Sequence, residues 1–184
     1  MNVMGFAAPS GTGKTTLMVG VIAALHARGL RVATLKHGHH AADPDIPGKD
    51  THRMRQAGAE SVLFSGPGLW FMIQEPRGEP PGLEEHLARL AGHDLILIEG
   101  YLDHSHPKIA VYRSSAPQGS QDRPMKGVVA VACDQPPPVV TPGVTLLPLD
   151  DAERVAAFIM EFFDLPRAAF STGPHPSRDM QFLL

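Results

Sequence analysis

The sequence predicts an α/β fold with a mostly parallel sheet, helices packed on it and an added antiparallel hairpin. A strand, a loop of small residues and a helix open the chain over residues 3–28, and a second strand follows at 30–36. This order makes one right-handed βαβ unit. Residues 94–100 form an apolar run without polar alternation, which indicates a central strand that is covered on both faces.

The length and composition favour one globular domain. The chain has 184 residues. Its one cysteine, Cys133, excludes an internal disulfide framework, and its net charge of −3 excludes a basic nucleic-acid surface. No segment approaches the ~20 uninterrupted apolar residues that cross a bilayer, and the first residues lack a signal-peptide pattern. We expect a cytoplasmic protein without nucleic-acid or membrane partners, with one domain over residues 1–165 and a mobile tail over 166–184.

The loop after the first strand has the spacing of a Walker A phosphate-binding loop, in the expected strand-loop-helix context. Small residues let consecutive backbone N–H groups point at phosphate oxygens, and the helix behind adds the positive end of its dipole. A chance match is the alternative, and the register of strand, loop and helix argues against it. The predicted nucleotide-binding residues are Pro9, Ser10, Gly11, Thr12, Gly13, Lys14, Thr15 and Thr16.

Four residues of this segment have individual expectations. Lys14 reaches the β- and γ-phosphates as a point charge, which makes it a candidate catalytic residue. The Thr15 hydroxyl lies where a bridging Mg²⁺ ion needs a ligand, and Thr16 supports the α-phosphate. Ala8 stands in the place of the first glycine, so we expect a negative φ there.

The first helix and the segment after the second strand follow from periodicity and composition. Over residues 14–28 apolar side chains repeat at three and four positions, and Gly29 ends the helix. Residues 37–50 contain two prolines and two glycines among many charges, which predicts a functional loop. A short helix then begins, with Asp50 or Thr51 as its cap.

The middle of the chain predicts a hairpin and a second short helix. Residues 60–65 and 69–73 are rich in apolar and aromatic side chains and are separated by a Gly-Pro-Gly turn, so we expect them to pair as antiparallel strands. A Pro/Gly loop follows at 77–82. Leucines at helical spacing then indicate a short helix over residues 83–90.

The last third of the chain predicts three more strands and a helix. Residues 108–113, 127–132 and 144–147 are enriched in apolar strand formers, and a polar loop separates the first two. Asp150 or Asp151 caps a helix whose apolar side chains recur at helical spacing. We find no internal repeat, so a single domain is the simplest interpretation.

The carboxyl ends of these strands define the predicted site, because ligands of a parallel α/β sheet bind beyond those ends. Glu99 ends the central strand as a Walker B acid does, and it is placed to hold Mg²⁺ or to polarise an attacking water. An ordinary exposed carboxylate is the alternative for Glu99. Asp50 is a second candidate metal ligand, and Asp134 follows the strand at 127–132.

Histidines offer a different interpretation. The chain has ten, and His37, His39 and His40 follow the second strand, which would suit a nickel or zinc site beside a nucleotide. A structural zinc site generally has four ligands, often with cysteine pairs, and this chain has one cysteine. A metallochaperone GTPase that uses this cluster is the alternative function, and solvated loop histidines are the ordinary explanation.

Several motifs together resemble the MobB family. They include a His-Gly-His-His segment, a Pro-Gly-Lys-Asp segment and a Glu-Gly-Tyr segment at the end of the central strand. These motifs are more particular than the phosphate loop, so we regard the match as close. The residues that carry it, besides the Walker A loop, are 35–40, 45–53, 56–59, 99–101 and 107–109, with Arg113.

The resemblance implies a three-layer α/β/α P-loop NTPase fold of the SIMIBI class. It implies a GTP-binding adaptor of molybdenum cofactor biosynthesis, which assists MobA in attaching GMP to molybdopterin to form molybdopterin guanine dinucleotide. MobB-like proteins are homodimers with at most weak GTPase activity. The resemblance therefore implies GTP and Mg²⁺ as ligands, a MobA-type guanylyltransferase and a second copy as partners, and the pterin itself as a further candidate.

The family's functional positions can be carried over to this chain. The nucleotide site is then the loop of residues 10–16, with Thr15 and Glu99 at the Mg²⁺ ion, and Asp50 is in the position of a switch loop near the metal or the γ-phosphate. GTPases often select guanine with Asn-Lys-x-Asp, whereas this chain has Val-Ala-Cys-Asp and keeps only the aspartate. We expect Asp134 to accept hydrogen bonds from guanine N1 and N2.

Overall fold

The chain forms two compact units. The computed structural model describes residues 1–38, 43–75, 78–116 and 125–166. Residues 1–35 and the chain from Gly92 onward form the first unit, and residues 36–91 form the second. The second unit lies within the span of residues 1–165 that the sequence predicts as one domain. The predicted tail falls outside the described residues from position 167 onward.

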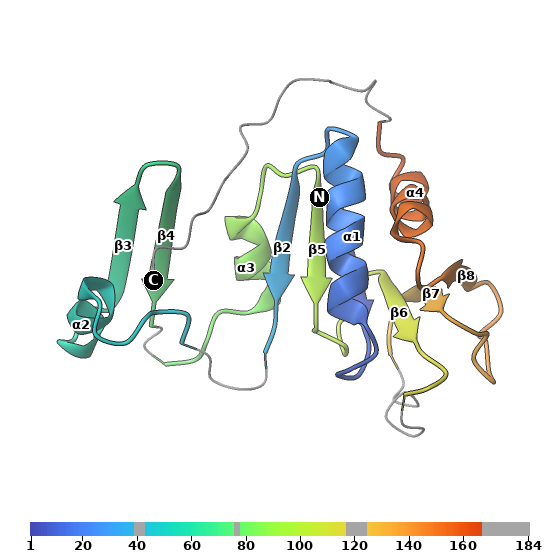
Figure 1. Ribbon diagram of the computed structural model, residues 1–184, viewed down its shortest axis with the longest axis horizontal. Coiled ribbons are helices and arrows are strands. Elements are labelled where there is room, and N and C mark those ends of the chain that lie inside the picture. Colours follow the sequence, from blue (N-terminus) through green and yellow to red (C-terminus); the bar gives the residue numbers. More distant parts are fainter. Residues whose placement is uncertain (39–42, 76–77, 117–124, 167–184) are drawn as a thin grey trace. The chain divides into compact units, whose positions relative to one another are not determined.

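A six-stranded sheet is the frame of the first unit (Figure 1). β1 lies between β5 and β6 and runs parallel to both, with Val3 opposite Ile96 and Gly5 opposite Lys108. The β6–β7 and β7–β8 pairs are parallel as well, which confirms the predicted mostly parallel sheet. In spatial order the strands are β2 (Val32–Lys36), β5 (Leu95–Glu99), β1 (Val3–Ala7), β6 (Lys108–Tyr112), β7 (Val128–Cys133) and β8 (Thr145–Pro148).

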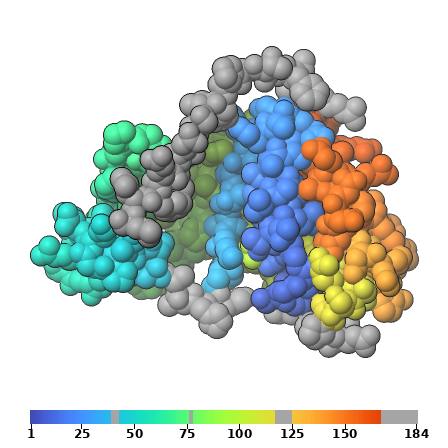
Figure 2. All heavy atoms as spheres, in the orientation of Figure 1, coloured from blue at the N-terminus to red at the C-terminus, as the bar shows by residue number. Residues whose placement is uncertain are grey.

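Two helices cover one face of this sheet. α1 (Lys14–Ala27) and α4 (Ala152–Phe162) lie side by side, as Figure 2 shows in blue and orange. Met4 and Phe6 of β1 are fully buried in the core that these helices close. A Cβ added to Gly20 of α1 would lie 2.7 Å from the Cβ of Ala152, so this glycine allows the close helix contact.

The chain passes from β5 to β6 without a helix, through residues 100–107. The connection is held by Lys108, which is fully buried and donates from its ammonium group to the main-chain oxygens of His104, His106 and Lys126. Burial lowers the pKa of the Lys108 ammonium. The His106 ring packs on Gly5, where a Cβ would lie 2.7 Å from Nε2. These contacts place the start of β6 beside the middle of β1.

The second unit contains a two-stranded antiparallel sheet, as predicted. Phe64 and Phe71 face each other across it, with ring centroids 5.2 Å apart. Arg55 is nearly buried and pairs with the carboxylates of Asp43, Asp45 and Glu75, which ties the preceding loop and the end of the sheet to one helix. The elements are α2 (Asp50–Gln56), β3 (Ser61–Gly66), β4 (Leu69–Gln74) and α3 (Leu83–Arg89).

Of the two helix caps that the sequence predicts, one is correct and one is wrong. Asp151 caps α4 by accepting a hydrogen bond from the Arg154 N–H at 2.9 Å. The prediction that Asp50 or Thr51 caps α2 is wrong, because Asp50 is already the first helical residue and the Thr51 hydroxyl donates to Asp45 instead. A carboxylate in the first turn favours the same helix through the dipole. In the described ranges, no helix is both long and apolar enough to cross a bilayer.

Candidate functional site

The Walker A segment forms a loop between the carboxyl end of β1 and α1. Gly11 and Gly13 have φ angles of 82° and 90°, in the left-handed region that glycine enters without strain. Thr12 is fully buried, and its hydroxyl donates to the Pro9 carbonyl at 3.0 Å, which braces the loop from inside. Ala8 is not among the residues with positive φ, as predicted. The loop therefore keeps its path although the first glycine is replaced.

The open side of the loop has the properties of an anion site. Ser10, Thr15 and Thr16 are exposed, so their hydroxyls are within reach of a ligand from solvent. Gly13 precedes α1 as its N-cap without a side-chain hydrogen bond, and the first turn of the helix has no acidic residue. The positive end of its dipole is thus not offset by a nearby carboxylate of the helix. A phosphate chain suits this arrangement.

The structure brings Lys14 and Glu99 together. Glu99 ends β5 beside Phe6 of β1, and its Oε1 lies 2.8 Å from the Lys14 Nζ. The two side chains are 15% and 14% exposed, so the pair is largely shielded from water. A phosphate that binds Lys14 has to compete with this carboxylate.

The predicted oxygen ligands of Mg²⁺ belong to different units. Thr15 follows Lys14 directly, so the Thr15 hydroxyl and the Glu99 carboxylate both belong to the first unit. Mg²⁺ prefers hydroxyl, carboxylate and phosphate oxygens, and these two residues fit that preference. Asp50 is the first residue of α2 in the second unit. Its approach to the metal stays a prediction.

Arg113 is a contact of the loop that the sequence did not reveal. It follows β6 directly, and its Nε donates to the main-chain oxygen of Thr12 at 3.0 Å. A Cβ on Gly13 would lie 2.8 Å from the Arg113 Nη2, so the guanidinium covers the start of α1. The sequence signals were its place at the carboxyl end of a predicted strand and its place among the residues that carry the family resemblance.

Asp134 accepts hydrogen bonds from Ser114, which lies just after the end of the neighbouring strand β6. Its Oδ1 accepts from the Ser114 main-chain N–H and its Oδ2 from the Ser114 hydroxyl, both at 2.8 Å. The Gln135 N–H also donates to Oδ1, at 2.9 Å. These hydrogen bonds, the one from the Ser114 N–H foremost, hold the pKa of the Asp134 carboxyl below its usual range. The carboxylate is thus ionised at neutral pH and already engaged on both oxygens.

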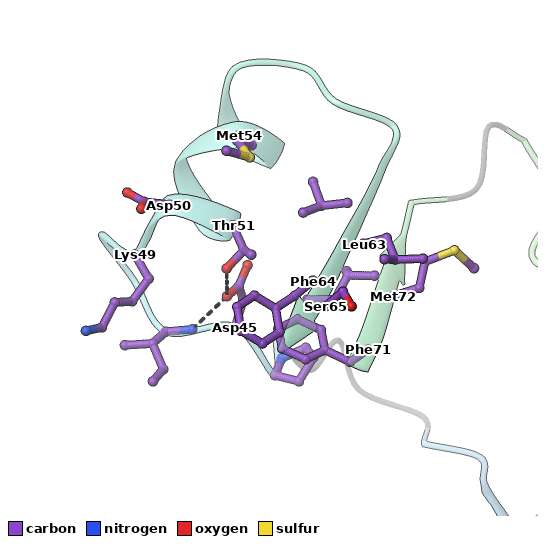
Figure 3. A pocket seen from close by; sticks show the side chains of 14 residues that line it. Asp45, Lys49, Asp50, Thr51, Met54, Leu63, Phe64, Ser65, Phe71 and Met72 are labelled. Carbon is purple, nitrogen blue, oxygen red and sulfur yellow. Dashed lines mark hydrogen bonds between the residues drawn. The ribbon is translucent and has the colours of Figure 1, made fainter. Parts of the chain in front are cut away.

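A groove of about 710 Å³ lies within the second unit. Its walls are α2 with the loop before it and the β3–β4 hairpin (Figure 3). The lining is mostly apolar, with Met54, Phe64 and Phe71 among its residues, and Asp45 and Asp50 add carboxylates. The sequence predicted the hairpin and the loop but not that they enclose a groove.

The histidines do not form a metal centre in the part of the chain that is described. His37 is exposed after β2, and His39 and His40 lie outside the described residues. His52 of α2 accepts a hydrogen bond from the Gly48 N–H of the preceding loop, and the His104 ring packs against Tyr101. Among the described residues no group of three or more His, Cys, Asp or Glu side chains could hold a metal ion. Nothing there supports the metallochaperone alternative.

Comparison with known sequences gives one consistent result. A family model described as molybdopterin guanine dinucleotide synthesis protein B, MobB, matches residues 3–134. The chain is 38% identical over 164 residues to the molybdopterin-guanine dinucleotide biosynthesis adapter protein of Escherichia coli K12, which covers 87% of this chain and 92% of that protein. The protein of the same name from Haemophilus influenzae is 33% identical over 160 residues, covering 85% and 86%.

Solved structures agree with this result. The crystal structure of a MobB protein homolog from Bacillus stearothermophilus has a TM-score of 0.68 at 27% identity, and the match covers 90% of this chain and 100% of that one. A crystal structure of molybdopterin-guanine biosynthesis protein B has a TM-score of 0.66 at 25% identity, covering 88% and 99%. The likeness therefore extends through nearly the whole length of both structures.

Proposed function

The chain belongs to the MobB family, the adapter proteins of molybdopterin guanine dinucleotide biosynthesis, and from this premise we propose that it binds GTP with Mg²⁺ in its Walker A loop and assists a MobA-type guanylyltransferase in the cytoplasm. The observation that supports this most directly is the loop itself. It combines two glycines of positive φ with a helix start that has no side-chain cap and whose first residue is Lys14.

The triphosphate occupies the open side of the loop in this proposal. The main-chain N–H groups of residues 10–16 donate to phosphate oxygens, and Lys14 leaves Glu99 to pair with the β- and γ-phosphates. Thr15 and Glu99 hold the Mg²⁺ ion, which neutralises part of the phosphate charge. Asp50 of the second unit stands as a further ligand near the metal or the γ-phosphate.

GTP hydrolysis is a minor activity in this proposal. Glu99 is the side chain placed to polarise an attacking water, yet it is paired with Lys14 in the structure. A base that serves as counter-ion and metal ligand is poorly available for proton transfer. Lys14 and Glu99 therefore serve nucleotide binding more than turnover, and phosphate release from GTP is expected to be slow.

Asp134 is the candidate residue for guanine selection. It follows β7 directly, in the unit that carries the loop, and its ionised carboxylate suits the donors N1 and N2 of guanine. Oδ2 accepts one hydrogen bond, from the Ser114 hydroxyl, and keeps a further lone pair for a guanine donor, whereas Oδ1 already accepts two. Titration of Asp134→Asn with GTP and ITP tests this role, because ITP lacks the N2 amino group. A role at N2 predicts that the variant loses the preference for GTP.

A second copy of this chain is the proposed partner of the hairpin. Leu63, Trp70 and Met72 lie on one face of the β3–β4 sheet and are 60%, 68% and 49% exposed. A two-stranded sheet with an exposed apolar face is marginal alone and suits a protein interface. Sedimentation of the wild type is expected to show a dimer, and Trp70→Glu is expected to shift it toward the monomer. A wild-type monomer would contradict the proposal.

Titration calorimetry with Lys14→Ala tests the nucleotide site. A charge-assisted hydrogen bond contributes about 1.5–3 kcal/mol, so the affinity for GTP with Mg²⁺ is expected to fall by an order of magnitude or more. Lys126→Ala is the matched control, because its side chain is exposed in the same unit. Equal affinities for GTP and ATP, or an unchanged affinity of Lys14→Ala, would contradict the proposal.

The adapter role needs its own measurement. Formation of the guanine dinucleotide can be followed with a MobA-type enzyme, molybdopterin and GTP, with and without this protein. We expect a higher yield with the wild type and with Lys126→Ala, and a smaller gain with Lys14→Ala. The pterin alone, titrated into the protein, shows whether the pterin is bound directly.

A further inference from the structure

A cation outside the Walker A motif is built into the phosphate loop. Arg113 lies 101 positions after Thr12 in the sequence, and its guanidinium still bonds the Thr12 main-chain oxygen. A Cβ on Gly13 would lie 2.8 Å from the Arg113 Nη2, so a side chain there would displace the guanidinium from this place. Gly13 thus leaves room for this contact in addition to adopting its positive φ. Arg113 holds the peptide that leads directly to Lys14.

The contact fixes the direction of one amide. The peptide bond between Thr12 and Gly13 is planar and trans, so its C=O and N–H groups point to opposite sides. With the Thr12 oxygen bound to Arg113, the Gly13 N–H points away from the guanidinium. The Thr12 hydroxyl bond to Pro9 restrains the same segment from inside the loop. A loop that grips phosphate by its amides depends on such directions being set before the ligand arrives.

The backbone next to Arg113 is fixed by hydrogen bonds to Asp134. The next residue, Ser114, donates from its N–H and its hydroxyl to the two oxygens of Asp134 at the end of β7. A charged acceptor makes both hydrogen bonds strong. A continuous path of contacts therefore runs from Asp134 through Ser114 and Arg113 to the Thr12–Gly13 peptide. All members belong to the first unit.

We propose that Arg113 is a positioning residue of the triphosphate site, that it orients the Thr12–Gly13 amide and adds positive charge beside the loop, and that Ser114 and Asp134 hold it there. The inference rests on the proposed function, because it requires the loop to bind a phosphate chain. It goes beyond the proposed function because it separates binding of the phosphates from recognition of the base. Arg113 acts on the phosphate part of the ligand and is indifferent to the base.

Titration calorimetry with two ligands tests the proposal. GTP carries the base and tripolyphosphate does not, and both are titrated with Mg²⁺ at a temperature at which each variant is folded. Arg113→Ala is expected to weaken both ligands by the same factor, about tenfold, since one charged group and one oriented amide are lost. Arg113→Lys is expected to weaken both by about threefold, because an ammonium keeps the charge without the planar fork.

Two further variants complete the test. Ser114→Ala is expected to weaken tripolyphosphate, and to weaken it less than Arg113→Ala does, because on the phosphate side it acts through Arg113. Arg31→Ala is the matched control, an exposed arginine of the same unit that pairs with Asp94 before β2 begins. It is expected to leave both affinities unchanged.

The outcomes separate this inference from the proposed function. Wild-type affinities retained by Arg113→Ala and Arg113→Lys would overturn the positioning role. A loss for GTP alone, with tripolyphosphate unaffected, would move Arg113 to the nucleoside and also overturn it. Should Arg113→Ala fail to fold, the comparison of Arg113→Lys with the wild type decides in the same way. A wild type that binds neither ligand would overturn the proposed function first.

Discussion

Replacing Glu99 by Gln changes the competition for Lys14. In the structure the Glu99 carboxylate lies 2.8 Å from the Lys14 ammonium, and each side chain is about one-seventh exposed. A nucleotide has to draw Lys14 away from this partner before the ammonium can reach the phosphates. The amide of Gln keeps the shape of the side chain and one hydrogen-bond acceptor, and removes the charge.

The size of the effect follows from the geometry. At the 2.8 Å separation of the Lys14 Nζ and the Glu99 Oε1, two unit charges attract by about 6 kcal/mol at an effective dielectric constant of about 20. Water at the open side and the hydrogen bond that the amide retains reduce the difference to about 1–2 kcal/mol. Without Mg²⁺, Glu99→Gln should therefore bind GTP about 5- to 30-fold more tightly than the wild type.

The sign should reverse when the metal is present. With Mg²⁺ the same substitution removes a proposed metal ligand, so the gain is expected to vanish or turn into a loss. Calorimetric titration of GTP in EDTA and in Mg²⁺ measures both cases. Glu161→Gln, at an exposed position of α4, is the control. A Glu99→Gln protein that binds GTP more weakly than the wild type in EDTA would refute the competition argument.

Three further predictions concern stability. Gly20→Ala should lower the free energy of unfolding by about 1–3 kcal/mol although Ala has the better helix propensity, because the new Cβ would lie 2.7 Å from the Cβ of Ala152. The double variant Gly20→Ala/Ala152→Gly should recover most of this loss. An unchanged urea midpoint of the single variant would contradict the prediction. Burial lowers the pKa of His106 from 6.5 to about 4, so its neutral form is stabilising above pH 6.5 and this contribution is lost as the pH falls toward 4. Urea midpoints at pH 7 and 5 should therefore differ less in His106→Leu than in the wild type, and an equal difference would assign the pH dependence to other groups. Arg55→Met should make the loop of residues 43–49 more sensitive to protease, since three carboxylates lose their common partner, and an unaltered cleavage pattern would count against that role.

The strands and helices were predictable where the local signal is strong. The two glycines of the Walker A loop need positive φ, and the run of residues 95–98 is apolar at every position, so few other conformations compete. The cap of α2 was not predictable. Asp50 and Thr51 both suit a cap by residue type, and the tertiary contact with Asp45 decided between a cap and a first turn.

The site was predictable in its motifs and not in its contacts. Lys14 and Glu99 could be placed at one sheet edge from topology alone, because parallel strands end together. Arg113 could not be tied to Thr12, since that pair lies 101 positions apart and leaves no periodic trace in the sequence. The engagement of Asp134 by Ser114 was hidden for the same reason.

The parallel neighbours of β1 have a consequence for synthesis on the ribosome. Val3 pairs with Ile96 and Gly5 with Lys108, so β1 waits for partners that are translated about a hundred residues after it. Until then Met4 and Phe6 remain uncovered, and a nascent chain with such long-range pairing folds slowly and is exposed to chaperones and to aggregation. Ribosome-bound chains truncated before Lys108 should therefore be digested by protease near the amino terminus, whereas chains released past β8 should resist.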